Sequence, residues 1–95
     1  MAVENRDLIQ RFYQDMLGSL VQYDQMHNTN MKSFLRIFIE EDGSTSKISK
    51  REFIHRNTVL YKVKKIETLL DADLSTPFTK TNLSIAFMIE DILSK

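Results

Sequence analysis

Apolar side chains recur at steps of three and four residues along almost the whole of this 95-residue chain. That spacing places them on one side of an α-helix, whereas a half-buried strand needs alternation at every second residue. Two glycines and one proline leave little material for the many tight turns of a β-sandwich or barrel. The pattern therefore predicts an all-α fold of about five helices.

Two helices are expected in the first part of the chain. Residues 8–21 and 31–39 each carry one apolar stripe, and Gly18 interrupts the first stripe at a point where it could end, bend or merely weaken the helix. Between the stripes lies a polar connector at 24–30 with two residues suited to cap the second helix, Thr29 and Asn30. Gly43 is expected to end that helix as a left-handed cap.

Three further helices follow. Residues 44–53 predict a short polar helix that begins at a serine or threonine cap and has only Ile48 and Phe53 as apolar anchors. Residues 56–70 predict a longer amphipathic helix. Residues 79–93, with Pro77 in the first turn, are apolar on nearly all sides, which places this helix in the core or against a partner chain.

Catalytic and metal-binding patterns are missing from the sequence. There is no cysteine, no glycine-rich phosphate loop, and no metal-ligand spacing around His27 or His55. Asp71 and Asp73 resemble the start of a calcium loop, but the positions that need glycine and glutamate hold Thr76 and Asn82. We therefore expect no enzyme activity, no metal, no cofactor and no small-molecule ligand.

No targeting or membrane segment is apparent either. The longest apolar run, residues 85–89, falls far short of the ~20 residues that a membrane span needs. Residues 1–16 carry acidic side chains throughout, unlike a signal or transit peptide. A cytoplasmic location without membrane contact is the expectation.

The centre of the chain is strongly basic although the whole chain has no net charge. Residues 43–66 contain seven lysine and arginine residues against Glu52 alone, and the acidic residues lie to either side. This segment also has the outline of a helix-turn-helix: a short helix, a tight connection at Phe53 and Ile54, and a longer helix with a basic outer face. The combination predicts binding to DNA.

The start of the second helix of this motif is predicted to read DNA. Its free N–H groups and positive dipole end suit a phosphate. In its first turn, Arg56 could read guanine and Asn57 adenine, with Thr58 beside them. Three further residues are predicted to lie opposite the Val59 face, along the groove and its phosphates: Tyr61, Lys62 and Lys65.

Further DNA contacts and simpler interpretations of the basic face accompany this prediction. Secondary contacts to the DNA backbone are predicted for Lys47, Lys50 and Arg51 of the short helix. His55 is expected to cap the longer helix rather than read a base. The basic face could also be an ordinary solvated surface, and Tyr61 could fold over the turn instead of facing DNA.

The string from His55 to Glu67 (HRNTVLYKVKKIE) closely resembles the hallmark of the C-terminal DNA-binding domain of PucR-type bacterial transcription regulators. Residues 17–24 (LGSLVQYD), Thr29-Asn30, residues 34–43 and the closing segment from Leu74 to Ala86 are similar to the same family, so that the resemblance covers roughly residues 12–93. It implies a helix-turn-helix like that of the factor for inversion stimulation, with the second helix in the major groove.

Members of that family are several hundred residues long and carry a sensory part and a cyclase-like domain ahead of this one. The resemblance thus implies that residues 1–11 are the tail of a linker helix and 12–95 the DNA-binding domain, with its motif at about 44–70. The chain is then a piece of a longer regulator or a stand-alone domain. Three positions depart from the family pattern: Ser19 replaces proline, Ser49 alanine and Glu52 leucine.

A single module offers little interface for specific binding, so we expect a homodimer on an inverted repeat in double-stranded DNA. Two surfaces have apolar area to spare for the dimer: the stripe from Leu8 to Val21 and the last helix. The alternative is a helical oligomerisation or protein-interaction module that has lost DNA binding, which the altered first helix of the motif keeps open.

Overall fold

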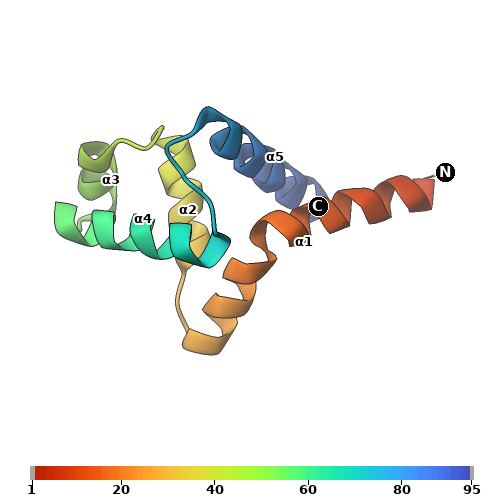
Figure 1. Cartoon of the computed structure of the whole chain (residues 1–95), viewed down its shortest axis with the longest axis horizontal. Coiled ribbons are helices and arrows are strands. Elements are labelled where there is room, and N and C mark those ends of the chain that lie inside the picture. The colour runs from red at the N-terminus through yellow and green to blue at the C-terminus, as the bar shows by residue number, and fades with distance from the viewer. Residues whose placement is uncertain (1, 95) are drawn as a thin grey trace.

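The computed structural model describes the backbone of residues 2–94 and the side chains of residues 6–94, and this part of the chain is all-α. Five helices follow one another: α1 (Ala2–His27), α2 (Met31–Glu40), α3 (Thr45–Glu52), α4 (Arg56–Leu70) and α5 (Pro77–Leu93) (Figure 1). The predicted fold class is therefore confirmed. None of the helices in the described range is long and apolar enough to cross a membrane.

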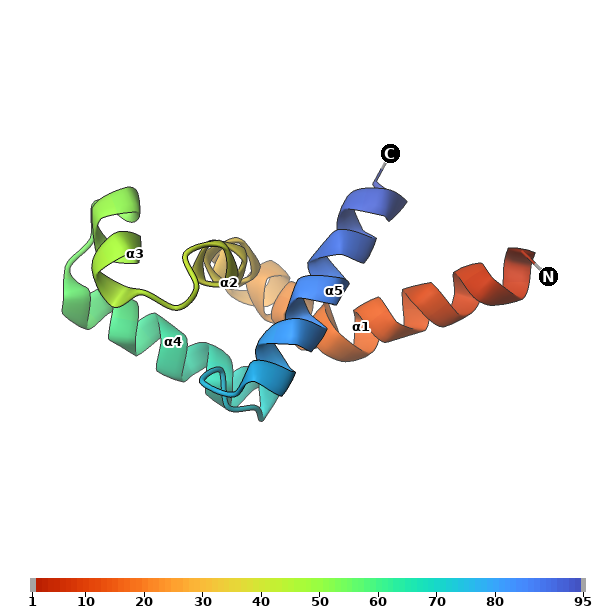
Figure 2. The ribbon, with the colours of Figure 1, turned by 90° about the horizontal axis from the view of Figure 1, so that it is seen from above.

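The helices form an elongated body of 48 × 28 × 26 Å. Helix α1 packs against α5, α2 and α4, whereas α3 packs against α4. Figure 2 shows α3 and the start of α4 at one end and the N-terminal part of α1 at the other, with α5 between them. The two helices of the motif thus lie together at one end of the molecule.

One apolar core joins all five helices. Thirteen of the side chains that the structure describes form it, and they are Leu17, Leu20, Met31, Phe34, Leu35, Phe38, Ile48, Val59, Ile66, Leu74, Leu83, Ala86 and Phe87. Helix α3 contributes Ile48 alone, while α4 contributes Val59 and Ile66. No polar or charged side chain in the described range is buried, so the fold depends chiefly on removing apolar surface from water.

Helix α1 is longer than the sequence pattern predicted. It runs unbroken through Gly18 to His27, although its ribbon changes direction partway along (Figure 1). The predicted connector at 24–30 therefore shrinks to residues 28–30. The apolar stripe could not reveal this, because the last turn of α1 is polar and packs little.

The cap of α2 also differs from the prediction. Asn30 occupies the N-cap position but makes no side-chain cap hydrogen bond. Instead the Asp24 carboxylate accepts hydrogen bonds from the backbone N–H groups of Met31 (2.7 Å) and Lys32 (3.0 Å) and from the Thr29 hydroxyl (2.7 Å). A negative side chain here satisfies free N–H groups and complements the helix dipole, so Asp24 joins α1 to α2.

The turn between α2 and α3 combines two local signals. Asp42 and Gly43 both have positive φ, at 53° and 74°, and the Gly43 N–H donates to the Phe38 carbonyl at 2.9 Å. This is the geometry in which helices commonly end. Asp42 shares the left-handed conformation that was predicted for Gly43 alone. The Ser44 hydroxyl then accepts from the Lys47 N–H and caps α3, as the sequence predicted.

The link from α4 to α5 is held by short polar contacts. The Glu67 carboxylate accepts from the N–H of buried Leu74 at 2.9 Å. Asp73 accepts from both the N–H and the hydroxyl of Ser75, and these hydrogen bonds lower the pKa of its carboxyl group. Thr76 caps α5, which begins at Pro77, two residues earlier than the apolar pattern suggested.

A cluster of charged side chains ties α5 to α1 and α2. Glu90 accepts from Lys32 Nζ at 2.6 Å, from the Tyr13 hydroxyl at 2.6 Å and from Arg36 at 3.1 Å, and Arg36 also pairs with Asp91. Partial burial by itself would raise the pKa of Glu90, but these hydrogen bonds and positive charges outweigh it and the pKa is lowered. The fold therefore stabilises ionised Glu90.

We expect Glu90→Gln to lower the free energy of unfolding at neutral pH by about 1–3 kcal/mol, because three donors lose an ionised acceptor. A lowered folded-state pKa contributes stability that is present above the unfolded value and lost as pH falls through the folded value. The free energy of unfolding, measured with urea from about pH 6 to about pH 3, should therefore decrease less for the variant than for the unmodified chain. Asp91→Asn, at a more exposed position, is the control, and equal losses for both would contradict the assignment.

Candidate nucleic-acid interface

Helices α3 and α4 meet through a three-residue turn, residues 53–55. Two contacts fix this turn: the Ile54 N–H donates to the Ser49 carbonyl at 3.2 Å, and the Ser49 hydroxyl donates to the Ile54 carbonyl at 2.6 Å. Serine at position 49, a departure from the resemblance noted above, thus adds a hydrogen bond across the turn. The two helices have the connection and order of a helix-turn-helix.

Phe53 does not anchor α3, so the prediction made for it is wrong. It lies at the end of α3 with φ of 57°, and 93% of its surface is exposed. The left-handed conformation turns the chain sharply into α4 and directs the ring away from the core. Ile48 is then the one buried side chain of α3, and the capping and turn contacts carry the rest of its positioning.

His55 caps α4, as predicted. Its Nδ1 atom accepts a hydrogen bond from the Asn57 N–H at 3.0 Å. The backbone N–H groups of Thr58 and Val59 point to the His55 carbonyl at 2.9 and 3.2 Å. Two N–H groups that were expected to be free for a phosphate, those of Asn57 and Thr58, are therefore already paired.

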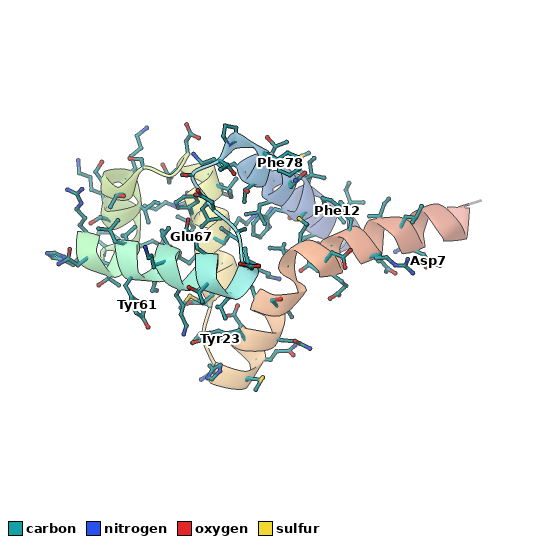
Figure 3. All side chains as sticks on the ribbon, viewed as in Figure 1. Asp7, Phe12, Tyr23, Tyr61, Glu67 and Phe78 are labelled. Carbon is teal, nitrogen blue, oxygen red and sulfur yellow. The ribbon has the colours of Figure 1, made fainter. Side chains whose placement is uncertain are left out.

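The predicted base-reading residues lie together at the exposed start of α4. Arg56, Asn57 and Thr58 are all exposed, while Val59 behind them is fully buried. Tyr61 follows one turn later with 64% of its surface exposed, and Figure 3 shows it pointing away from the other helices. Tyr61 does not fold over the turn, so the alternative raised for its ring is wrong.

Lys62 and Lys65 lie differently from the prediction. Their Nζ atoms stand 5.2 Å and 5.3 Å from the ring centroids of Phe34 and Tyr23, close enough for a cation–π attraction. Both side chains are half-buried at the flank of α4 next to α2 and α1. The prediction that they share the face opposite Val59 is therefore wrong, and their contact with DNA stays a prediction.

Lys64 is the basic residue that the sequence reasoning missed on this face. It is exposed, and it follows Asn57 by seven residues and Tyr61 by three. Those separations put all three side chains on the same side of a helix. The helical spacing from Asn57 and Tyr61 therefore favours Lys64 over Lys62 or Lys65 as the lysine on this face.

The three basic residues of α3 divide into two groups. Lys47 and Lys50 are exposed, and neither takes part in an ion pair within residues 6–94. Arg51 is held at 2.8 Å by both Glu40 and Glu41 at the end of α2. These carboxylates satisfy its guanidinium, so Arg51 fastens α3 to α2.

Nothing in residues 6–94 forms a cluster of metal-ligating side chains. The exposed surface of α3 and α4 instead gathers unpaired positive charge beside groups able to form hydrogen bonds with base edges. Fold and surface together define a helix-turn-helix domain, a class that inserts its second helix into the major groove of DNA.

Comparisons with known proteins agree with this class. The profile of the PucR C-terminal helix-turn-helix domain matches residues 33–89. The purine catabolism regulatory protein of Bacillus subtilis (strain 168) is 31% identical over 86 residues, which are 90% of this chain and 16% of that protein. The DNA-binding transcriptional activator AdeR of the same organism is 40% identical over 62 residues, 65% of this chain and 15% of that protein.

The chain belongs to the PucR C-terminal helix-turn-helix family and is a DNA-binding domain of the transcription-regulator class. It spans about a sixth of the length of the two relatives it matches. No solved structure matches it significantly.

We expect Phe53→Gly to raise the free energy of unfolding. A bulky side chain in the left-handed region costs roughly 1–2 kcal/mol, and the greater freedom of glycine in the unfolded chain offsets about half of that. The net gain should be about 0.5–1 kcal/mol in urea unfolding. Phe53→Ala, which keeps the strained backbone and removes the ring, is the control. Destabilisation by glycine would show that the ring is needed for the fold.

Proposed function

We propose that this chain binds DNA sequence-specifically as part of a bacterial transcription regulator, with α4 in the major groove. One observation carries the proposal: α4 buries Val59 and Ile66 and thereby leaves Arg56, Asn57 and Thr58 exposed at the free end of a helix-turn-helix. The similarity to two bacterial regulators supports it. A cytoplasmic location belongs to the same proposal, because bacterial chromosomal DNA lies there.

Each exposed residue of α4 has a role in this proposal. Arg56 donates two hydrogen bonds to a guanine edge, and Asn57 donates to and accepts from an adenine edge. Thr58 and Tyr61 contact a base or the adjoining backbone. Lys64, which shares the outer face with Asn57 and Tyr61, reaches a phosphate deeper along the groove.

Phosphate contacts flank this central set. Lys62 and Lys65 lie at one side of α4, next to the rings of Phe34 and Tyr23. A lysine can leave such a ring at little cost in free energy and extend to a phosphate at the wall of the groove. Lys47 and Lys50 of α3 face the nearer DNA backbone. Arg51 is the weakest of the proposed contacts, since it would first have to release Glu40 and Glu41.

The binding unit is proposed to be a homodimer on an inverted repeat. Two-fold symmetric proteins read half-sites about one helical turn apart. Residues 1–11, of which Met1 lies outside the described part, are proposed to be the end of a linker helix, and 12–95 the DNA-binding domain. The extension of α1 beyond the other helices supports this division (Figure 1). No catalysis and no small-molecule ligand are assigned to this domain.

The second candidate function is a protein-interaction or oligomerisation module that has lost DNA binding. The observation in its favour is the sparse anchoring of α3, which buries Ile48 alone and carries Glu52 where the resemblance leads one to expect leucine. Both functions predict binding that weakens with salt. Only the regulator predicts that binding depends on DNA sequence.

The deciding experiment is selection from a random duplex pool, with this chain fused to a known dimerising partner to compensate for weak self-association. A regulator should enrich a short inverted repeat. Failure to enrich any sequence even at low salt would overturn sequence-specific binding and favour the interaction module.

We expect Arg56→Ala to weaken binding to the selected sequence by about 1–3 kcal/mol and to relax the preference at one base pair per half-site. Arg11→Ala, which removes the same charge from exposed α1, should leave the preference unchanged. Binding isotherms on matched and mismatched duplexes measure both. Unchanged affinity in a folded Arg56→Ala protein would remove this residue from base reading.

We expect Lys62→Ala, Lys64→Ala and Lys65→Ala each to weaken binding to all duplexes alike and to reduce the salt slope by about 1, because each removes one phosphate contact. Lys80→Ala on α5 is the control and should change neither quantity. Titrations at several salt concentrations on selected and random duplexes give the slope. A loss confined to the selected sequence would contradict a phosphate role.

A further inference from the structure

Helix α5 has two apolar faces, of which the core uses one. Leu83, Ala86 and Phe87 are buried against α1 and α2. On the opposite side lie four large apolar side chains with exposed fractions of 78%, 39%, 57% and 66%: Phe78, Ile85, Met88 and Ile92. A helix that only covered a core would carry polar side chains there. We call these four residues the α5 stripe.

The α5 stripe has the spacing of a helix-packing seam. Its last three members follow one another at steps of three and four residues, the separation of successive a and d positions in a heptad repeat, and Phe78 lies one heptad before Ile85 with Thr81 at the position between them. Such a row runs along one side of a helix and fits into the grooves of a second helix. The stripe is therefore shaped to receive another helix rather than a small molecule.

The charges around the α5 stripe indicate which helix packs against it. A two-fold interface sets a surface against its own copy, so it must be free of unbalanced charge. The residues beside the stripe fit this condition, because Asn82, Ser84 and Ile89 are uncharged and Asp91 is neutralised by Arg36. Among the other exposed apolar side chains, Phe53, Leu60 and Tyr61 lie among the lysines of α3 and α4, where a second copy would be repelled. Leu8 and Ile9 lie among the charged residues of α1, namely Arg6, Asp7 and Arg11.

The stripe also lies where a partner would not block DNA. Helix α5 packs on α1 and α2, whereas α3 packs on α4 at one end of the body (Figure 2). A copy bound along α5 therefore leaves the exposed start of α4 open in both subunits. Phe78 also lines a groove towards α1 and α4, whose other walls include Met16, Leu70 and Leu83 together with Asp15 and Asp71.

We propose that the α5 stripe is the dimer interface, with α5 of one copy packed against α5 of a second copy across a two-fold axis. This rests on the proposed function, which calls for two copies on two half-sites. One helix pair buries less than the ~800 Å² per partner of a standard interface. The dimer is accordingly weak in solution, and adjacent half-sites on DNA strengthen it.

The first test compares Met88→Lys/Ile92→Lys with Met26→Lys, which changes a more exposed methionine near the end of α1. Sedimentation velocity over a range of concentrations should show a reversible dimer for the unmodified chain and for Met26→Lys, and a monomer for the double variant. Circular dichroism checks that all three are folded. An unmodified chain that stays monomeric at every concentration, or a double variant that dimerises equally, would overturn the proposal.

The second test uses the absence of cysteine from the chain. Met88→Cys should give a covalent dimer with a bismaleimide, and Met26→Cys should not. Equal cross-linking of the two would count against the stripe. The duplex selection separates the two hypotheses, because the fused partner supplies the dimer there. A fusion carrying Met88→Lys/Ile92→Lys should still enrich the sequence, whereas failure of the DNA proposal would remove enrichment from the unmodified fusion as well.

Discussion

The burial of Val59 and Ile66 is the constraint on which the rest of this molecule depends. These two side chains lie seven residues apart on one side of α4 and both are fully buried. Their burial fixes the rotation of α4 about its own axis, and with it the side chains that face solvent. Asn57, Tyr61 and Lys64 are exposed for this reason. A different rotation would turn the basic residues into the core and expose the apolar ones, at a cost of several kcal/mol.

Polar contacts fix the position of a helix that contributes little to the small core. The short helix α3 buries Ile48 alone, so its place depends on the Ser44 cap, the hydrogen bond from Ser49 across the turn and the pairing of Arg51 with Glu40 and Glu41. Charge is also separated in space. Lysines gather on α3 and α4, whereas the α5 stripe is apolar and the exposed Asp91 beside it is paired with Arg36. The first surface suits a polyanion and the second a copy of itself.

Local signals in the sequence were sufficient to predict the start of a helix wherever the residue acts only on its own neighbours. The cap residues Ser44 and His55 and the helix-starting Pro77 were placed correctly, because each acts on its own neighbouring N–H groups or fixes its own φ. The helical periodicity gave the five helices and the core face of α4. Predictions failed where residue type alone did not fix which neighbour supplies a cap or which way a side chain turns. Asp24 rather than Asn30 caps α2, and Phe53 is exposed although it is apolar.

The sequence by itself determined the all-α fold, the order of its helices and the helix-turn-helix with its first-turn residues, since these follow from spacing along one chain. The tertiary structure alone decided which basic side chains are available to a partner. Lys62 and Lys65 turn to the rings of Phe34 and Tyr23, and Arg51 turns to the end of α2, while Lys64 stays exposed. The physical reason is that charge and periodicity belong to a residue and its neighbours, whereas the aromatic ring or carboxylate that a long side chain meets belongs to another helix.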